Sequence, residues 1–72
     1  MIYIMEVFAK RLRGLREEKG LSMRQLAAVF SLTKGSIYQY EHNLSEPSQE
    51  LMIKIADYFG VSMDYLYGKS DY

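Results

Sequence analysis

The chain has 72 residues, no cysteine, one histidine and a formal net charge of zero. This length predicts one small domain over residues 1–72 with a limited core. The hydrophobic content of 49% is enough to form that core and argues against a disordered chain. The absence of cysteine excludes a disulfide framework and thiolate metal sites, and a single histidine argues against zinc. We therefore expect no metal and no cofactor.

No apolar run approaches the roughly 20 residues that a membrane-spanning helix needs. The start of the chain, MIYIM, is too short for a signal peptide and lacks the basic region of one. We expect a cytoplasmic protein with no membrane partner.

The charges are distributed unevenly along the chain. Residues 1–40 hold seven of the nine Lys and Arg with three Glu, a formal charge of +4, and residues 41–72 carry −4. A basic half beside an acidic half suits a surface that faces phosphate on one side. Ordinary solvated helix faces produce the same asymmetry, so both interpretations stay open.

The first predicted helix covers residues 5–19. Its inward stripe is Phe8, Leu12 and Leu15, and its outward cations are Lys10, Arg11 and Arg13. Gly14 lies in mid-helix, where glycine lowers helix stability by up to ~1 kcal/mol relative to alanine. Its presence there predicts a close contact with a neighbouring element. Gly20 suits a left-handed helix end.

Residues 22–41, SMRQLAAVFSLTKGSIYQYE, predict two short helices joined by a tight turn. Ser22 and Gln25 have the spacing of a capping box at the start of a helix over 23–30. Thr33 is placed to cap a second helix over 33–41. The inward residues are Leu26, Ala27 and Phe30 in the first helix and Ile37 and Tyr40 in the second. The small Ala27, at the point where the helices cross, favours a helix-turn-helix.

A fourth helix is predicted over residues 48–59 and a fifth over 63–67, with a polar tail at 69–72. Ser48 and Ser62 are placed to cap them, and Gly60 and Gly68 to end them. The expected inward residues are Leu51, Met52, Ile53, Ile55, Tyr58, Phe59, Val61, Tyr65 and Leu66. Met63 and Tyr67 are expected to be exposed or at a dimer contact.

Residues 22–41 resemble the helix-turn-helix of the phage repressor and Cro family, the XRE-like regulators. RLRGLREEKGLS at 11–22 is similar to the first helix of that family, EPS at 46–48 to its loop into the fourth helix, and DYFGVSMDYLYG at 57–68 to its closing segment. The resemblance implies an all-α, compact five-helix lambda-repressor-like domain, with no room for a small-molecule effector domain.

The apolar residues 1–5 precede the part that resembles the family. They are a first helical turn, a strand added to a partner, or a tail that orders only in an oligomer. Met5 is a candidate for the native start, since the segment that begins there is a natural start for this family.

The resemblance places the base-contacting residues on the helix over 33–41. They are Lys34, Ser36, Tyr38 and Gln39. Lysine can donate to guanine, glutamine can pair with adenine, and tyrosine can contact a thymine methyl. Gly35 presents no side chain there, so DNA shape is expected to supply part of the specificity. The alternative is a polar helix face that only meets water.

Four residues are candidates for phosphate contacts, which position a domain without reading sequence. They are Ser22, Arg24, Thr33 and Asn43. The resembled family has glycine where this chain has Ser31, so a left-handed serine with a strain of about 1–2 kcal/mol is expected in the turn. The resemblance also pairs Arg16 with Glu41, as a structural ion pair of two-point geometry.

The resemblance implies a sequence-specific DNA-binding transcriptional regulator, most simply a homodimeric bacterial or phage-type repressor. Its two recognition helices would lie about 34 Å apart on a palindromic operator. The alternative is a protein-interaction module, such as an antitoxin or a partner-binding regulator, which Met23, Gly35, Leu44 and MIYIM favour. We expect no enzyme, because the sequence has no cysteine, no glycine-rich phosphate loop and no carboxylate pair placed in a cleft.

Overall fold

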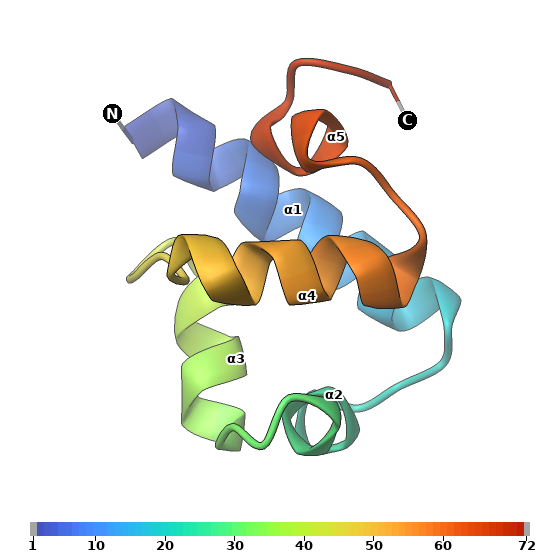
Figure 1. The fold of residues 1–72 in the computed structure, drawn as a ribbon. Coiled ribbons are helices and arrows are strands. Elements are labelled where there is room, and N and C mark those ends of the chain that lie inside the picture. The colour runs from blue at the N-terminus through green and yellow to red at the C-terminus, as the bar shows by residue number, and fades with distance from the viewer. Residues whose placement is uncertain (1, 72) are drawn as a thin grey trace.

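The computed structural model describes residues 2–71, which form five α-helices and no strand (Figure 1). The helices are α1 (Ile2–Glu18), α2 (Met23–Val29), α3 (Lys34–Glu41), α4 (Gln49–Phe59) and α5 (Met63–Tyr67). The Cα radius of gyration is 10.9 Å, close to the roughly 11 Å of a folded chain of this length. The predicted all-α, five-helix fold is confirmed.

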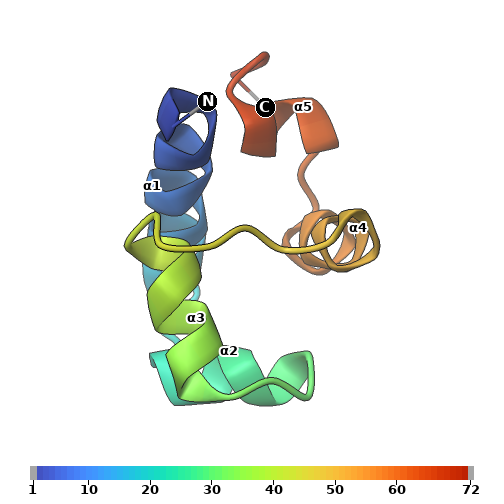
Figure 2. The same ribbon diagram turned by 90° about the vertical axis from the view of Figure 1, so that its left-hand side faces the viewer.

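One hydrophobic core joins all five helices. Its buried residues are Phe8, Leu12 and Leu15 from α1, Leu26 and Ala27 from α2, Ile37 from α3, Met52, Ile55 and Ala56 from α4, and Leu66 from α5. α3 and α5 both pack against α1, and α4 lies on the other side of this core (Figures 1 and 2). The helix-turn-helix is therefore one corner of a shared core and not a separate unit.

Hydroxyl side chains start four of the helices. The Ser22 hydroxyl accepts from the backbone N–H of Gln25 at 3.0 Å, and the Gln25 side chain accepts from the N–H of Ser22 at 2.8 Å, which is the predicted capping box. Thr33, Ser48 and Ser62 cap α3, α4 and α5 in the same way, each through one bond. A cap of this kind contributes about 1 kcal/mol.

Each of the five described helices ends in the same backbone motif. One residue adopts a left-handed conformation, and the residue after it donates its N–H to the carbonyl five positions back. These bonds run from Leu21 to Arg16, Leu32 to Ala27, Leu44 to Gln39, Val61 to Ala56 and Lys69 to Asp64, at 2.8–3.1 Å. The left-handed residues are Gly20, Ser31, Asn43, Gly60 and Gly68. Only Ser31, with φ of 57°, is a residue type poorly suited to this conformation.

Residues 2–5 continue α1 as its first helical turn, so of the three interpretations of this segment the helical one is correct. Met1 and Tyr72 lie outside the described residues. The predicted close contact at Gly14 is wrong: this glycine is exposed, and nothing lies within 4 Å of the place where a Cβ would stand.

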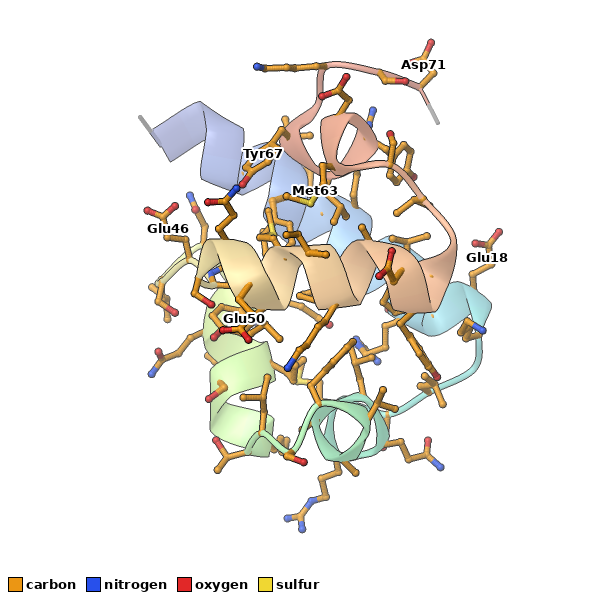
Figure 3. The ribbon with its side chains drawn as sticks, viewed as in Figure 1. Glu18, Glu46, Glu50, Met63, Tyr67 and Asp71 are labelled. Atoms are coloured by element: carbon orange, nitrogen blue, oxygen red, sulfur yellow. The ribbon has the colours of Figure 1, made fainter. Side chains whose placement is uncertain are left out.

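The prediction for Ile53 in α4 is wrong, and for Met63 and Tyr67 in α5 the exposed alternative is wrong while the dimer contact stays a prediction. Ile53 is 46% exposed, because Met52, Ile55 and Ala56 define the inward face of α4 and Ile53 lies about 100° around the helix from Met52. Met63 and Tyr67 are partly buried and pack against the core (Figure 3). α5 has only five residues and packs against both α1 and α4, which leaves little of it exposed.

Arg11 holds the C-terminal segment against α1 and does not face outward as predicted. Its Nη1 donates to the carbonyl oxygens of Tyr65 and Ser70, both at 2.6 Å. Its guanidinium also lies 4.2 Å from the centroid of the Tyr65 ring, within cation–π range. Both ends of the described chain thus lie on the side opposite α2 and α3 (Figures 1 and 2).

We expect the Ser31→Gly variant to be more stable than the wild type by about 0.5–1 kcal/mol, because glycine removes the left-handed strain at a small entropic penalty. Urea denaturation followed by circular dichroism measures the difference. Asn43→Gly is the matched control and should gain less, since asparagine tolerates this conformation. A destabilised Ser31→Gly variant would contradict this account of the turn.

Candidate nucleic-acid interface

α2, the turn and α3 meet in the predicted helix-turn-helix geometry. The two helices cross at a steep angle at one end of the molecule (Figures 1 and 2). Ala27 and Ile37 are both buried in the core that this crossing shares with α1. The small side chain of Ala27 permits the close approach that the sequence predicts.

α3 presents one continuous exposed stripe. Its members are Lys34, Gly35 and Tyr38, then Gln39 and, just past the helix end, His42. The spacing of these residues, three or four apart on successive turns, puts them on one side of the helix. The structure therefore brings three of the four predicted base contacts, Lys34, Tyr38 and Gln39, onto the same face.

Ser36 lies at the flank of this stripe and is only partly exposed. Its backbone N–H donates to the Thr33 hydroxyl at 3.2 Å, and the two hydroxyl oxygens lie 3.2 Å apart. Both side chains are engaged in starting α3. A DNA contact from Thr33 or Ser36 has to share a hydroxyl that already forms a hydrogen bond within the protein.

The remaining phosphate candidates lie at the ends of the two helices. The Ser22 side chain is occupied by the capping box, and Arg24 is exposed in the first turn of α2. Asn43 adopts the predicted left-handed conformation, with φ of 59°, directly after α3. Among these candidates, Arg24 offers the one mobile positive charge.

Much of the positive charge of residues 1–40 is engaged within the fold. Arg11 binds the C-terminal segment, Arg13 lies 3.4 Å from Glu17, and the Lys19 ammonium lies 5.0 Å from the centroid of the Tyr58 ring. Residues 22–43 contain only Arg24 and Lys34 as cations. The charge asymmetry of the sequence therefore overstates the positive charge that the helix-turn-helix can present to phosphate.

Arg16 and Glu41 form a buried two-point ion pair between α1 and the end of α3. Nε donates to Oε2 at 2.6 Å and Nη2 to Oε1 at 3.0 Å, and the Glu41 side chain is 0% exposed. The hydrogen bond to Glu41 raises the pKa of the Arg16 guanidinium above its usual value, although burial opposes this, so the cation is retained. Nη1 of the same group donates to the carbonyl of Leu21 at 2.8 Å, immediately before α2.

His42, to which the sequence analysis assigns no role, contacts Tyr38. The two rings stack with centroids 3.8 Å apart and planes 17° apart. His42 Nδ1 also lies 2.8 Å from the Tyr38 carbonyl oxygen. The signal that could have found this pair is the spacing of four between two aromatic residues on one helix.

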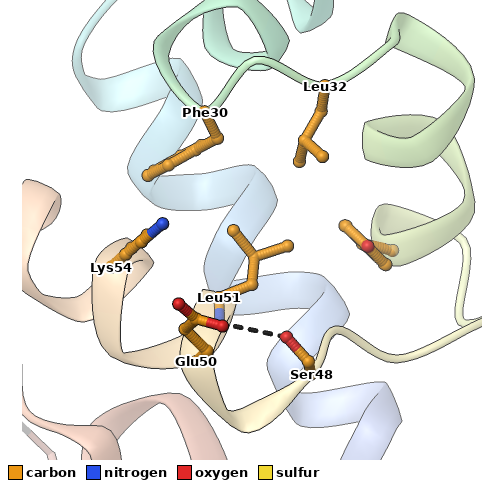
Figure 4. A pocket seen from close by; sticks show the side chains of 7 residues that line it. Phe30, Leu32, Ser48, Glu50, Leu51 and Lys54 are labelled. Carbon is orange, nitrogen blue, oxygen red and sulfur yellow. Dashed lines mark hydrogen bonds between the residues drawn. The ribbon is translucent and has the colours of Figure 1, made fainter.

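An open pocket of about 400 Å³ lies behind the turn, between α4 and the helix-turn-helix (Figure 4). It is lined by Phe30, Leu32, Tyr40, Ser48, Glu50, Leu51 and Lys54. Tyr40 points away from the exposed stripe of α3, so this pocket and the stripe are on different sides of that helix. In residues 6–71, no buried side-chain nitrogen or oxygen lacks a hydrogen-bond partner.

Residues 2–71 contain no cluster of three or more His, Asp or Glu residues placed to hold a metal ion. None of the helices found there has the length and apolar character needed to cross a bilayer.

Residues 12–66 match the model of the helix-turn-helix family. The chain belongs to this family. It is a family of DNA-binding domains of the phage repressor and Cro (XRE) type. The match covers the whole crossing of α2 and α3, including every residue of the exposed stripe.

Three curated relatives illustrate the range of similar proteins. The chain is 39% identical over 59 residues to a protein of Aeropyrum pernix named as an HTH-type transcriptional regulatory protein, covering 82% of this chain and 18% of that one. It is 34% identical over 65 residues to the uncharacterized HTH-type transcriptional regulator YobD of Bacillus subtilis, covering 90% and 58%. It is 27% identical over 62 residues to the HTH-type transcriptional regulator ImmR of the same species, covering 86% and 49%. The chain thus spans from about a fifth to three fifths of the length of these relatives.

We expect Arg16→Met to destabilise the fold by roughly 3–5 kcal/mol, because it leaves the buried Glu41 carboxylate without its partner. Arg16→Met combined with Glu41→Leu should recover much of this loss, since neither charge is then stranded. Urea denaturation of the two single variants and the double variant gives the coupling between the residues.

The exposed pair Arg13 and Glu17 is the control, and Arg13→Ala should change stability by less than about 0.5 kcal/mol. If Arg16→Met fails to fold, Arg16→Lys, which keeps the charge but not the two-point geometry, should fold with an intermediate loss. An Arg16 variant as stable as the Arg13 variant would contradict a structural role for the buried pair.

Proposed function

We propose that this chain is a sequence-specific DNA-binding transcriptional regulator that reads the major groove of duplex DNA with α3. The observation that carries the proposal is the exposed stripe of Lys34, Tyr38 and Gln39 on the second helix of a helix-turn-helix. The names of the relatives, which call them HTH-type transcriptional regulators, support the same function. A protein of this kind acts on chromosomal DNA, which places it in the cytoplasm.

The side chains on the stripe suit groove edges. Lys34 can donate to guanine O6 and N7, and Gln39 can pair with adenine through both ends of its amide. Arg24 and Asn43 would contact the DNA backbone directly, and Ser22 and Thr33 would do so by sharing hydroxyl groups that already act as helix caps. The ion pair between Arg16 and Glu41 would keep α3 at a fixed angle to the rest of the domain. No catalytic step is part of this function.

The size of α3 supports binding as a homodimer. A helix of eight residues is about 12 Å long and covers roughly four base pairs. A single copy would therefore recognise too short a sequence to select one site in a genome. Two copies related by a twofold axis would read a palindromic operator with half-sites about 34 Å apart. Occupation of a promoter by such a dimer would make the protein a repressor.

A second candidate is a protein-interaction module such as an antitoxin. The observation that favours it is the exposure of apolar side chains, with Leu44 66% and Ile53 46% exposed. In this function the same fold would present an apolar surface to another protein, with or without DNA. The experiment below separates the two candidates.

The test of the first candidate is selection from a pool of random duplexes at low salt. The wild-type protein should enrich a palindrome, and Lys34→Ala and Gln39→Ala should each lose about 1–3 kcal/mol of binding to it, with relaxed preference at one base pair. Arg13→Ala, which removes an exposed side chain from α1, is the control and should bind like the wild type. If the wild type enriches no sequence, the protein-interaction module becomes the better account.

We also expect a shallow dependence of DNA affinity on salt, because Arg24 and Lys34 are the only cations in the helix-turn-helix. With Arg24 at the backbone and Lys34 in the groove, two positive charges per protomer displace counterions, which gives a slope of log K against log salt of about −2, or about −4 for a dimer. Arg24→Gln should reduce the slope by about 1 per protomer, whereas Arg13→Gln should leave it unchanged. A slope near −6 per protomer would mean that all seven basic residues of the N-terminal half face the DNA.

A further inference from the structure

His42 and Tyr38 form one unit on the exposed side of α3. The rings are four residues apart, a spacing that brings side chains of a helix together. Their centroids lie 3.8 Å apart and their planes are inclined by 17°, which is a face-to-face stack. The pair therefore orders an exposed tyrosine ring that a helix surface would otherwise leave free to change rotamer.

The backbone holds the imidazole of His42 in place. The Tyr38 carbonyl oxygen accepts from the His42 backbone N–H at 3.0 Å and lies 2.8 Å from Nδ1 of the same residue. A carbonyl oxygen only accepts, so this geometry requires a proton on Nδ1. The backbone N–H and Nδ1 of His42 thus both bond to the Tyr38 carbonyl oxygen, and this fixes the plane of the imidazole ring against Tyr38.

The stack lies beside the candidate base contacts. Tyr38 remains 45% exposed although His42 covers one of its faces. It belongs to the same stripe as Lys34, one turn earlier, and directly precedes Gln39. A tyrosine side chain in this place carries a hydroxyl that both donates and accepts, and a ring that can contact a thymine methyl.

We propose that His42 is a positioning residue for DNA recognition. It holds the Tyr38 ring in one orientation, and in that orientation Tyr38 reads a single base pair next to those read by Lys34 and Gln39. This inference rests on the proposed function and adds a specificity-determining pair to it.

The expected size of the effect follows from side-chain ordering. Fixing a free side chain at an interface lowers affinity by an amount equivalent to about two- to twelvefold in the dissociation constant. In this protein the stack orders Tyr38 before DNA arrives. Loss of the stack should therefore weaken binding to the selected site by about three- to tenfold, and the loss should concentrate at one base pair.

The experiment is selection from random duplexes with the full chain, comparing Tyr38→Ala, His42→Ala and His42→Phe with the wild type. Tyr38→Ala should remove the preference at one base pair, and His42→Ala should weaken the preference at that same position only. His42→Phe keeps an aromatic plane and should restore it. Arg13→Ala is the control on a different helix, and thermal unfolding of each variant establishes that it is folded at the binding temperature.

Each other outcome overturns the proposal in a recognisable way. If His42→Ala weakens all positions equally, His42 acts only on the stability of α3. If Tyr38→Ala changes no position, Tyr38 does not read a base. If the wild type selects a sequence and His42→Ala selects it equally well, the positioning role is wrong while the proposed function stands. If the wild type selects nothing, the proposed function fails first.

Discussion

The position of α3 depends on one guanidinium group. Arg16 reaches from α1 and binds the Glu41 carboxylate at the end of α3 and the Leu21 carbonyl just before α2. Residues 22–41 are therefore attached at both ends to the same side chain. Arginine suits this task because its planar group donates in several fixed directions, which a lysine ammonium does not. A change at Arg16 therefore acts on the angle of α3 without altering any residue of its exposed stripe.

Local signals in the sequence predict most of the fold. Ser22 and Ser48 start helices at the expected positions and Gly60 ends one, because caps and left-handed turns depend on a few neighbouring residues. Long-range contacts are harder to predict. A five-residue α5 has too short a periodicity to show which side is buried, so the contacts of Met63 and Tyr67 depend on how α5 packs on α1 and α4.

In the candidate site, too, some features can be predicted from the sequence and others depend on long-range contacts. The resemblance to the phage repressor family predicts polar residues on the outer face of α3 and an ion pair between Arg16 and Glu41. The structure has both the exposed stripe and the ion pair. The use of Arg11 inside the fold could not be predicted, because its partners are carbonyl groups more than 50 positions away. Formal charge counted along a chain gives no information on which cations are already engaged. In this protein the consequence is a helix-turn-helix whose own cations are only Arg24 and Lys34.

The path of the chain near Arg11 bears on how such a domain is built into larger proteins. Arg11 fixes the carbonyls of Tyr65 and Ser70 against α1, on the side of the molecule away from α2 and α3. A polypeptide joined at the C-terminus would emerge on that side and leave α2 and α3 unobstructed. The relatives are longer than this chain. A segment fused at the C-terminus would also leave the domain in a defined direction, because the carbonyl of Ser70 is hydrogen-bonded to Arg11 of α1.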